Sequence, residues 1–343
     1  MSDRYMPSTR KRLPALGKSS SKILIIIDHP DTKAFKVGKI LDGACLGALQ
    51  ESLNQADLVF SDVCVECLVP DDPNPARWWV AKNSNRPLKD LTATREHLNY
   101  ILANSKANII LGMGDLAHYL LTDRRKLHQD RGYIFPCTVP GFEGRKVMGL
   151  QDIKKMIWGN YLQRYYLASD IQKAYENSES PEIIYDQRET RIVTNVQEAN
   201  VLISNLIIRA TAESKAVSVD IEVSNFQVSH IGFAIEKEKG FSIPFNNQQW
   251  TIEEEVEVWR WINAIMGDPK VAKVGQNFIF DIHFLLIQNA IITRGEIIDT
   301  MMAQSVYYPD FLKGLGFLAS IYINVPQWKD MVSHKDVKIK EDN

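Results

Sequence analysis

The chain has 343 residues, of which 45% are hydrophobic and 24% are charged, a composition typical of a folded protein large enough for two domains. Its formal net charge of -2 excludes a general electrostatic attraction to nucleic acid, so any such contact must come from local patches or bound metal ions. The sequence contains no apolar run long enough to span a membrane and no secretory leader pattern at its start, which predicts a cytoplasmic protein with no membrane association.

The first half of the sequence alternates between strand and helix patterns. Residues 1–21 combine Pro, Ser and a basic cluster without apolar periodicity, which is typical of a disordered tail. Strands are predicted over 22–28, 56–69 and 107–114, helices over 36–55, 92–105 and 152–177, and a strand pair over 131–150. Strands that alternate with helices predict a mostly parallel sheet covered on both faces. We therefore expect a first α/β domain over 22–176.

A polar stretch, "NSESPE" at 177–182, predicts a domain boundary. After it come a strand and a helix over 190–208, a strand over 215–223, hairpin-like strands over 229–245 and a helix that opens with the capping box Thr251-x-x-Glu254. A short strand then leads into a helix over 270–290. This order predicts a second α/β domain with a mixed sheet, over 184–343.

Four cysteines raise the question of a metal site. Cys64 and Cys67 form a CxxC pair, but the pair lies in a predicted strand, and Cys45 and Cys137 do not form a second pair. Structural or free thiols and a metal site both remain open from the sequence, and the strand context favours free thiols.

Two acids, Asp220 and Glu222, end an apolar strand pattern in "AVSVDIEVSN". Residues two apart on a strand share a face, so these like charges lie close together and repel. A bound cation, a retained proton or solvent screening can relieve that repulsion. The acids therefore mark either a metal site or a solvated strand end.

A further acid and an amide occur in "VGQNFIFD". Asn277 and Asp281 are four residues apart in a predicted helix, which would place both on one face, close enough to reach the Asp220/Glu222 pair. Carboxylate and amide oxygens suit two Mg²⁺ or Mn²⁺ ions, and such a pair of ions can activate water and stabilise the leaving oxygen of a phosphodiester.

The segments "VSVDIEV", "IGFAI", "IPF", "VGQNFIFD" and "IIDTMMAQSVYYPDFLKGLGFLASIY", in this order, resemble the 3'-5' proofreading exonuclease domain of family A (Pol I-like) DNA polymerases, which has a ribonuclease-H-like fold. The resemblance covers about residues 185–335. It implies that Asp220, Glu222 and Asp281 are the catalytic, metal-binding carboxylates, and that Asn277 with the adjacent Gln276 contacts the substrate strand at a single-stranded DNA 3' end. Val223 stands where many relatives carry Thr.

That family completes its site with a third motif, Tyr-x-x-x-Asp. None of Tyr307, Tyr308 and Tyr322 is followed by Asp at this spacing, and no polymerase domain follows. The resemblance therefore implies a module of a split or truncated polymerase whose missing motif lies on a partner chain. A phage origin, which the resemblance also suggests, would place the protein in the host cytoplasm.

Segments of the first half, among them "KILIIIDHPDTKAFKVGKILDGACLGALQESL" and "RGYIFPCTVPGFEGRKVMGLQD", resemble in order the three-layer uracil-DNA glycosylase fold. Two catalytic elements of that family are altered here. The early water-positioning loop reads Asp28-His29-Pro30-Asp31, and the anion-stabilising loop is replaced by residues 150–152, Leu-Gln-Asp. We therefore expect a structural or DNA-holding domain rather than an active glycosylase.

Three functions stay open for the second domain: a metal-dependent 3'-5' exonuclease acting on DNA, a non-catalytic scaffold that positions DNA for a polymerase, and an RNase D-like ribonuclease. The "YPDFLKGLGFLASIY" segment favours the polymerase lineage over the ribonuclease. The three acids favour the exonuclease over the scaffold, because a scaffold has no need of a cluster of like charges.

Overall fold

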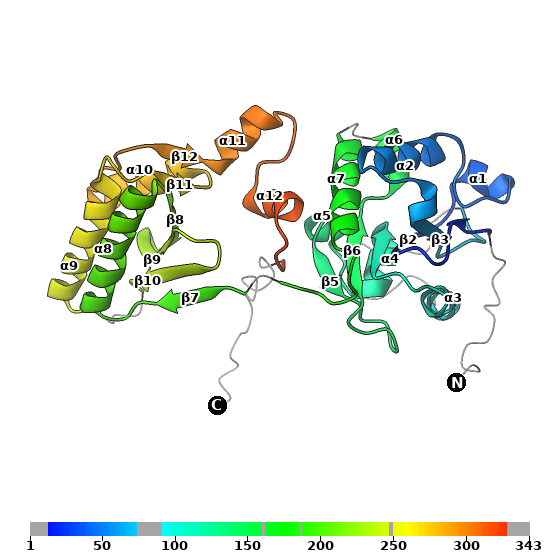
Figure 1. Ribbon diagram of the computed structural model, residues 1–343, viewed down its shortest axis with the longest axis horizontal. Coiled ribbons are helices and arrows are strands. Elements are labelled where there is room, and N and C mark those ends of the chain that lie inside the picture. Colours follow the sequence, from blue (N-terminus) through cyan, green and yellow to red (C-terminus); the bar gives the residue numbers. More distant parts are fainter. Residues whose placement is uncertain (1–12, 74–90, 160–161, 186, 247–249, 328–343) are drawn as a thin grey trace. The chain divides into compact units, whose positions relative to one another are not determined.

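The fold was determined as a computed structural model, which describes residues 13–73, 91–159, 162–185, 187–246 and 250–327. The chain forms two compact units (Figure 1). One consists of Met1–Tyr185 together with Gly316–Asn343, and the other of Asp186–Leu315. None of the helices in the described ranges is long and apolar enough to cross a membrane.

The first unit is built on a six-stranded sheet with the order β1-β3-β2-β4-β6-β5. Its strands are β1 (Leu16–Gly17), β2 (Ile23–Ile27), β3 (Val63–Cys67), β4 (Ile109–Met113), β5 (Ile134–Pro136) and β6 (Lys146–Leu150). The four inner strands run parallel, and β1 and β5 pair antiparallel at the edges. Every residue of β2, β4 and β6 is buried, as expected for a parallel sheet covered on both faces. The predicted mostly parallel sheet is confirmed.

Helices cover both faces of this sheet. They are α1 (Thr32–Lys36), α2 (Gly43–Gln55), α3 (Thr92–Ala103), α4 (Asp115–Thr122), α5 (Leu127–Asp130), α6 (Ile153–Trp158) and α7 (Gln163–Glu176), with a short 3-10 helix η1 at Phe60–Asp62. Successive residues of β2 point to opposite faces, so Ile25 joins the apolar core formed with α2 and α7, and Ile26 joins the core formed with α3 and α4. The unit is thus a three-layer α/β/α arrangement.

A helix from late in the sequence, α12 (Leu315–Tyr322), contributes to the first unit from Gly316 onward. The Lys173 ammonium, on α7, donates to the carbonyl oxygens of Ser320 and Ile323, each at 2.8 Å. These carbonyls belong to the carboxyl end of α12, where a positive charge is favourable. Burial lowers the pKa of Lys173 to about 8.

Arg131 forms the second attachment point of α12. Its guanidinium pairs with the buried carboxylate of Asp170, donates to the Ser320 hydroxyl at 3.0 Å, and lies 5.1 Å from the centre of the Phe317 ring. The predicted domain limits, 22–176 and 184–343, stay predictions, and the structure adds that residues 316–324 pack with the first unit.

The second unit has a six-stranded mixed sheet with the order β12-β11-β8-β9-β10-β7. Its strands are β7 (Glu189–Ile192), β8 (Val217–Ser224), β9 (Gln227–Ala234), β10 (Lys239–Pro244), β11 (Lys273–Gly275) and β12 (Ile297–Asp299). Strands β8, β9 and β10 form an antiparallel meander, while β7, β11 and β12 run parallel to their neighbours. The mixed sheet predicted for this part of the chain is confirmed.

Four helices belong to the second unit: α8 (Val196–Glu213), α9 (Ile252–Gly267), α10 (Phe278–Asn289) and α11 (Thr300–Tyr307). Helices α8 and α9 pack side by side and share one apolar core with the sheet (Figure 1). The capping box at the start of α9 is present as predicted, because the Thr251 hydroxyl accepts from the Glu254 N–H and the Glu254 carboxylate accepts from the Thr251 N–H.

Three local predictions in the first unit were wrong. The helix expected over 36–55 begins only at Gly43, because Gly38 adopts a left-handed conformation (φ +69°) that interrupts a helix. The helix expected over 152–177 is two helices, and α6 ends at Gly159. The tail expected over 1–21 includes β1, which pairs with β3; residues 1–12 lie outside the described ranges.

Candidate active site

Strand β8 presents Asp220 and Glu222 on its exposed face. Exposed and buried residues alternate along β8, so both acids project to the same side, as the sequence predicts. The residue paired with Asp220 on β9 is Gly232, which has no side chain to cover that carboxylate. Beyond Glu222 the pairing shifts at a bulge, a feature that re-aims neighbouring side chains.

Asp281, in the first turn of α10, is held against β8 by the backbone. The Ile221 N–H donates to Asp281 Oδ1 at 3.0 Å, and only 4% of Asp281 is exposed. Strand β11 pairs with β8 only as far as Ser218. Beyond that point, Asp281 of α10 accepts a hydrogen bond from the β8 backbone. The Asp281 carboxylate therefore contacts β8 at Ile221, the residue between the two exposed acids.

The carboxylates of this site affect each other's protonation. Loss of surrounding water, followed by the charge of Glu222, raises the pKa of Asp220. Burial raises the pKa of Asp281 to about 6, and the nearby charge of Asp220 adds to the effect. Within the described ranges, no Lys, Arg or His side chain forms an ion pair with any of the three acids. Their negative charge is thus uncompensated.

Asn277 differs from its predicted placement. Helix α10 begins at Phe278, and Asn277 precedes it in the left-handed conformation (φ +54°), so the four-residue helical spacing to Asp281 was a wrong basis for placing both on one face. The reason lies in Asp299, whose carboxylate accepts the N–H groups of Asn277 (3.0 Å) and Phe278 (2.8 Å) and so caps the helix from β12. The Asn277 side chain is exposed, and its substrate-binding role stays a prediction.

Gln276 uses its side-chain amide inside the unit. Its Nε2 donates to the Lys313 carbonyl oxygen at 2.6 Å, and its Oε1 accepts from the Thr300 hydroxyl. Both ends of the amide are therefore engaged, and the predicted contact of Gln276 with substrate stays untested.

The donor groups of the site suit hard divalent cations. Asp220 and Glu222 offer carboxylate oxygens on one exposed face, and a cation bound there would stabilise the charged form of Asp220, whose pKa is raised. In the part of the chain that the structure describes, however, no three His, Cys, Asp or Glu side chains are arranged as a metal-binding group. The chemistry of the acids fits a divalent ion, while a third ligand is not in position.

Phe226, which the sequence analysis did not single out, lies at the tip of the β8–β9 hairpin. It is 86% exposed and has φ +60°, as does its neighbour Asn225 at +51°. Two-residue hairpin turns of this kind favour Gly at the second position, so a bulky exposed ring there is locally unfavourable. The "SNFQ" turn between two alternating patterns was the signal that could have identified it. An exposed ring four residues beyond Glu222 suits stacking on a nucleobase.

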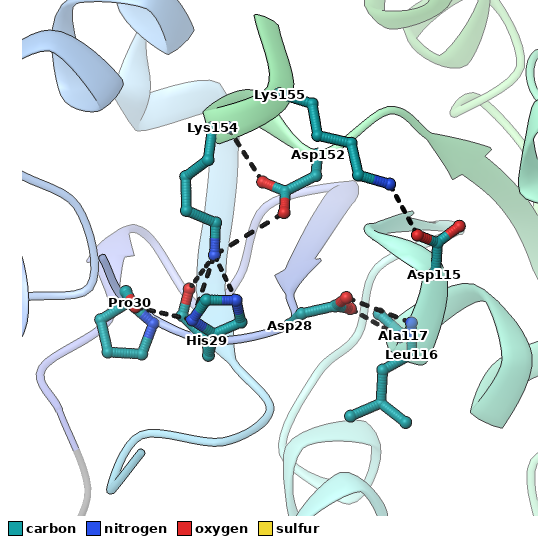
Figure 2. Close-up of polar contacts among 9 residues, drawn as sticks. All are labelled: Asp28, His29, Pro30, Asp115, Leu116, Ala117, Asp152, Lys154 and Lys155. Atoms are coloured by element: carbon teal, nitrogen blue, oxygen red, sulfur yellow. Dashed lines mark hydrogen bonds and ion pairs between the residues drawn. The ribbon is translucent and has the colours of Figure 1, made fainter. Parts of the chain in front are cut away.

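In the first unit, Asp28 and His29 of the altered loop directly follow β2 (Figure 2). The Asp28 carboxylate accepts the N–H groups of Leu116 (3.1 Å) and Ala117 (2.7 Å) at the start of α4. Burial, followed by the charge of Asp152, raises the pKa of Asp28 to about 7. Asp28 thus caps a helix in its buried position.

The His29 ring is hydrogen-bonded to the Lys154 ammonium. Its Nδ1 lies 2.8 Å from the Pro30 carbonyl oxygen and therefore carries the proton, so Nε2 accepts from the Lys154 ammonium at 2.6 Å. Burial, followed by the Lys154 charge, lowers the pKa of His29 to about 4. His29 is a neutral, 4% exposed group. Cys45, Cys64, Cys67 and Cys137 are all buried free thiols, as the strand context favoured.

Comparison with known protein families gives one match: residues 191–338 match the 3'-5' exonuclease family. The match covers less than half of the 343 residues and includes Asp220, Glu222 and Asp281. No protein of curated function matches the chain in sequence.

Several solved structures resemble the chain at low sequence identity. The EXD2 exonuclease domain soaked in Mn and GMP is 18% identical with a TM-score of 0.29, covering 40% of this chain and 70% of that one. Escherichia coli RNase D, described as an exoribonuclease involved in structured RNA processing, is 19% identical with a TM-score of 0.27, covering 34% of this chain and 28% of that one. The catalytic core of RRP6 from Trypanosoma brucei is 14% identical with a TM-score of 0.33, covering 46% and 40%.

Proposed function

We propose that the second unit hydrolyses the terminal phosphodiester bond at single-stranded DNA 3' ends, with Asp220, Glu222 and Asp281 holding two Mg²⁺ or Mn²⁺ ions. The observation that supports this most strongly is that the Asp281 carboxylate is bonded to the β8 residue between Asp220 and Glu222, with raised pKa values at Asp220 and Asp281 and no ion pair to the three acids among the described residues. The exonuclease family match to the same residues supports it independently.

The residues of the chain would divide the work by position. Two divalent ions, when bound, supply an activated water and stabilise the leaving oxygen. Asp220 and Glu222 share a face and bind the ions there, with the open space beside Gly232 available to the substrate end. Asp281, anchored by the Ile221 N–H, keeps a fixed carboxylate beside them and must lose its proton to bind a cation.

We further propose that a Tyr-x-x-x-Asp segment from outside the described residues, such as one on a partner chain, completes the site. The absence of a third positioned ligand in the described ranges supports this. Without that segment, binding of the ions is weak, and misplacing the attacking water by about 1 Å can reduce the rate about a hundredfold. The chain alone is then a slow nuclease.

The test measures metal binding and cleavage on the full chain. Titration with Mn²⁺ should show binding that is lost in Asp220→Ala and kept in Glu253→Gln, which removes an exposed acid from the first turn of α9. With enzyme in excess over a 5'-labelled single-stranded DNA, shortening from the 3' end should follow the same order. Equal shortening by wild type and Asp220→Ala, or no difference in Mn²⁺ binding, would contradict the proposal and favour the scaffold.

An RNase D-like ribonuclease is the second candidate, because it would use the same acids on RNA. Parallel assays with DNA and RNA strands of one sequence separate the two. Faster cleavage of DNA is expected. Faster cleavage of RNA, lost in Asp220→Ala, would replace the DNA assignment while leaving the site intact.

For the first unit we propose a glycosylase-like domain that has a structural or DNA-holding role and does not release uracil. Its support is that Asp28 is engaged by the α4 backbone and His29 by Lys154, so neither is free to position water. Incubation with uracil-containing duplex should yield no abasic sites. Uracil release that disappears in His29→Ala would overturn this part.

A further inference from the structure

Residues 307–313, the last residue of α11 and the turn after it, are attached to the segment that leads into α10, the helix of Asp281. Strands β11 and β8 are parallel, with Lys273 opposite Val217 and Val274 opposite Ser218. Strand β11 ends at Gly275, and Gln276 follows it two residues before α10, the helix that carries Asp281. The Gln276 amide donates to the Lys313 carbonyl oxygen at 2.6 Å, which attaches the end of the turn to this segment.

The turn is closed by its own hydrogen bonds. The Tyr308 N–H donates to Gln304 O at 2.8 Å, and the Phe311 N–H donates to Tyr308 O at 3.1 Å. The Lys313 ammonium donates to the carbonyl oxygens of Pro309 (2.7 Å) and Phe311 (3.1 Å). A positive charge is thus held in place on the turn instead of extending freely into water.

Three aromatic rings are ordered on this turn. Phe311 is buried, with 6% exposed, and Tyr308 stacks on it at 4.6 Å with an interplanar angle of 14°. Tyr307 meets Tyr308 edge to face at 4.5 Å and 74°, yet 71% of Tyr307 is exposed. The outermost ring is therefore oriented by its neighbour while most of its surface remains open.

We propose that the 307–313 turn binds the single-stranded nucleic acid that enters the acid site, with the Tyr307 ring stacking on a base and the Lys313 ammonium contacting a phosphate. The inference rests on the proposed nuclease function, which supplies the strand. Sites for single strands combine a positive charge that follows the backbone with rings on which bases stack, and this turn offers both on seven residues. A ring held in one orientation loses side-chain freedom before binding, so less is lost when a base stacks on it.

The geometry also limits which nucleotides are bound. Helix α11 has eight residues and begins beside Asp299, the cap of α10, so its far end lies about 12 Å along the helix. That separation exceeds one nucleotide, so the turn serves bases upstream of the terminal one. Substrates of two nucleotides should gain nothing from it, whereas strands of six or more should.

A protein partner is the competing occupant, because Val306 (82% exposed) and Leu312 (62% exposed) adjoin the rings. Asp310, an exposed acid in the same turn, separates the two possibilities. It repels a phosphate, so its removal should strengthen binding of a strand.

The experiment measures binding by the full chain, in EDTA to prevent cleavage, of fluorescein-labelled oligo(dT) of two and ten nucleotides. Tyr307→Ala should weaken binding of the ten-nucleotide strand about tenfold, and Tyr307→Trp should restore it. Lys313→Gln should reduce the salt dependence by about one phosphate contact, and Asp310→Asn should tighten binding. Val306→Ala, one residue away, is the matched control and should bind as wild type does.

Equal binding by wild type and Tyr307→Ala would overturn the inference, as would equal weakening by Val306→Ala, because the loss would then not depend on the Tyr307 ring. Because the measurement needs no cleavage, failure of the nuclease proposal shows separately, as cleavage unaffected by Asp220→Ala while the Tyr307 effect on binding persists.

Discussion

Two groups of acids lie at the carboxyl ends of strands, one in each unit, and their surroundings differ. In the first unit, Asp28 accepts two backbone N–H groups of α4, and Lys154 and Lys155 form ion pairs with Asp152 and Asp115 nearby. Every carboxylate of this group has a partner. The group is complete within the unit (Figure 2).

In the second unit, Asp281 accepts one backbone N–H, whereas the Asp220 and Glu222 carboxylates accept no hydrogen bond from the described residues. Burial is the first cause of the raised pKa of Asp28 (to about 7) and of Asp281 (to about 6) alike. A raised pKa therefore does not distinguish the two groups. Missing partners among the described residues do, and the proposed cation site depends on them.

The largest effect expected from this difference is on cleavage. Asp281→Asn should reduce 3'-end cleavage about 10²–10³-fold, because it removes a carboxylate whose charge a two-ion site uses, an effect of several kcal/mol. Asp28→Asn should leave the rate unchanged, since Asp28 belongs to the completed group. Initial rates on single-stranded DNA measure both. A similar loss in the two variants would mean that the groups act together.

The second effect concerns the close packing around Asp28. A Cβ at Gly114 would lie 2.3 Å from Asp28 Oδ2, and Gly114 has φ +121°. Gly114→Ala should destabilise the chain by about 3 kcal/mol, because both the clash and the backbone strain must be relieved. Gly38→Ala is the control, since Gly38 has φ +69° but no atom near the new Cβ, and should lose only about 1 kcal/mol. Urea unfolding compares them, and equal losses would show that Asp28 moves freely.

The sequence predicted the acid site because its signals are local. Alternation along β8 placed Asp220 and Glu222 on one face, and the "VGQNFIFD" segment brought Asp281 close. The placement of Asn277 failed because its conformation is set by Asp299, twenty-two residues later, and side-chain caps from another strand leave no local pattern.

The packing of α12 on the first unit could not be predicted from the sequence for the same reason. Its apolar residues indicate a buried face but not which surface covers it, and the resemblance assigned the whole segment to the exonuclease domain. The contacts that attach it come from Arg131 and Lys173, well over a hundred residues earlier in the chain. The break at Gly159 was a local signal that the helical periodicity on both sides obscured.

The third effect tests that attachment. Lys173→Met should lose the bonds to Ser320 O and Ile323 O and leave the buried Ser320 carbonyl unpaired, which costs about 2 kcal/mol. Amide hydrogen exchange over 316–325 should accelerate accordingly. Lys155→Met, which removes an exposed ion pair with Asp115, should leave that exchange unchanged. Unchanged exchange in Lys173→Met would show that α12 is held by its apolar contacts.

The smallest expected effect is on the stability difference between wild type and Asp281→Asn, and it is measured without metal. The pKa of Asp281 in the folded chain, about 6, exceeds the ordinary value of about 3.9, so its contribution to stability is complete below pH 4 and is lost as the pH rises through 6. Asp281→Asn keeps an oxygen for the Ile221 N–H and carries no charge, so at pH 8 in EDTA it should raise the stability of the chain by on the order of 1 kcal/mol. At pH 4 the gain should vanish, since wild-type Asp281 is then protonated.

Asp310→Asn, at an exposed acid of the same unit, should show no such pH dependence. Millimolar Mn²⁺ should then reverse the order at pH 8, because an ion that binds only the folded wild type stabilises it by mass action and the Asn variant binds it less well. Thermal unfolding at the two pH values, with and without Mn²⁺, measures all four states. A variant less stable than wild type at pH 8 in EDTA would mean that the Asp281 charge is already compensated within the unit, and the contrast with the Asp28 group would no longer hold.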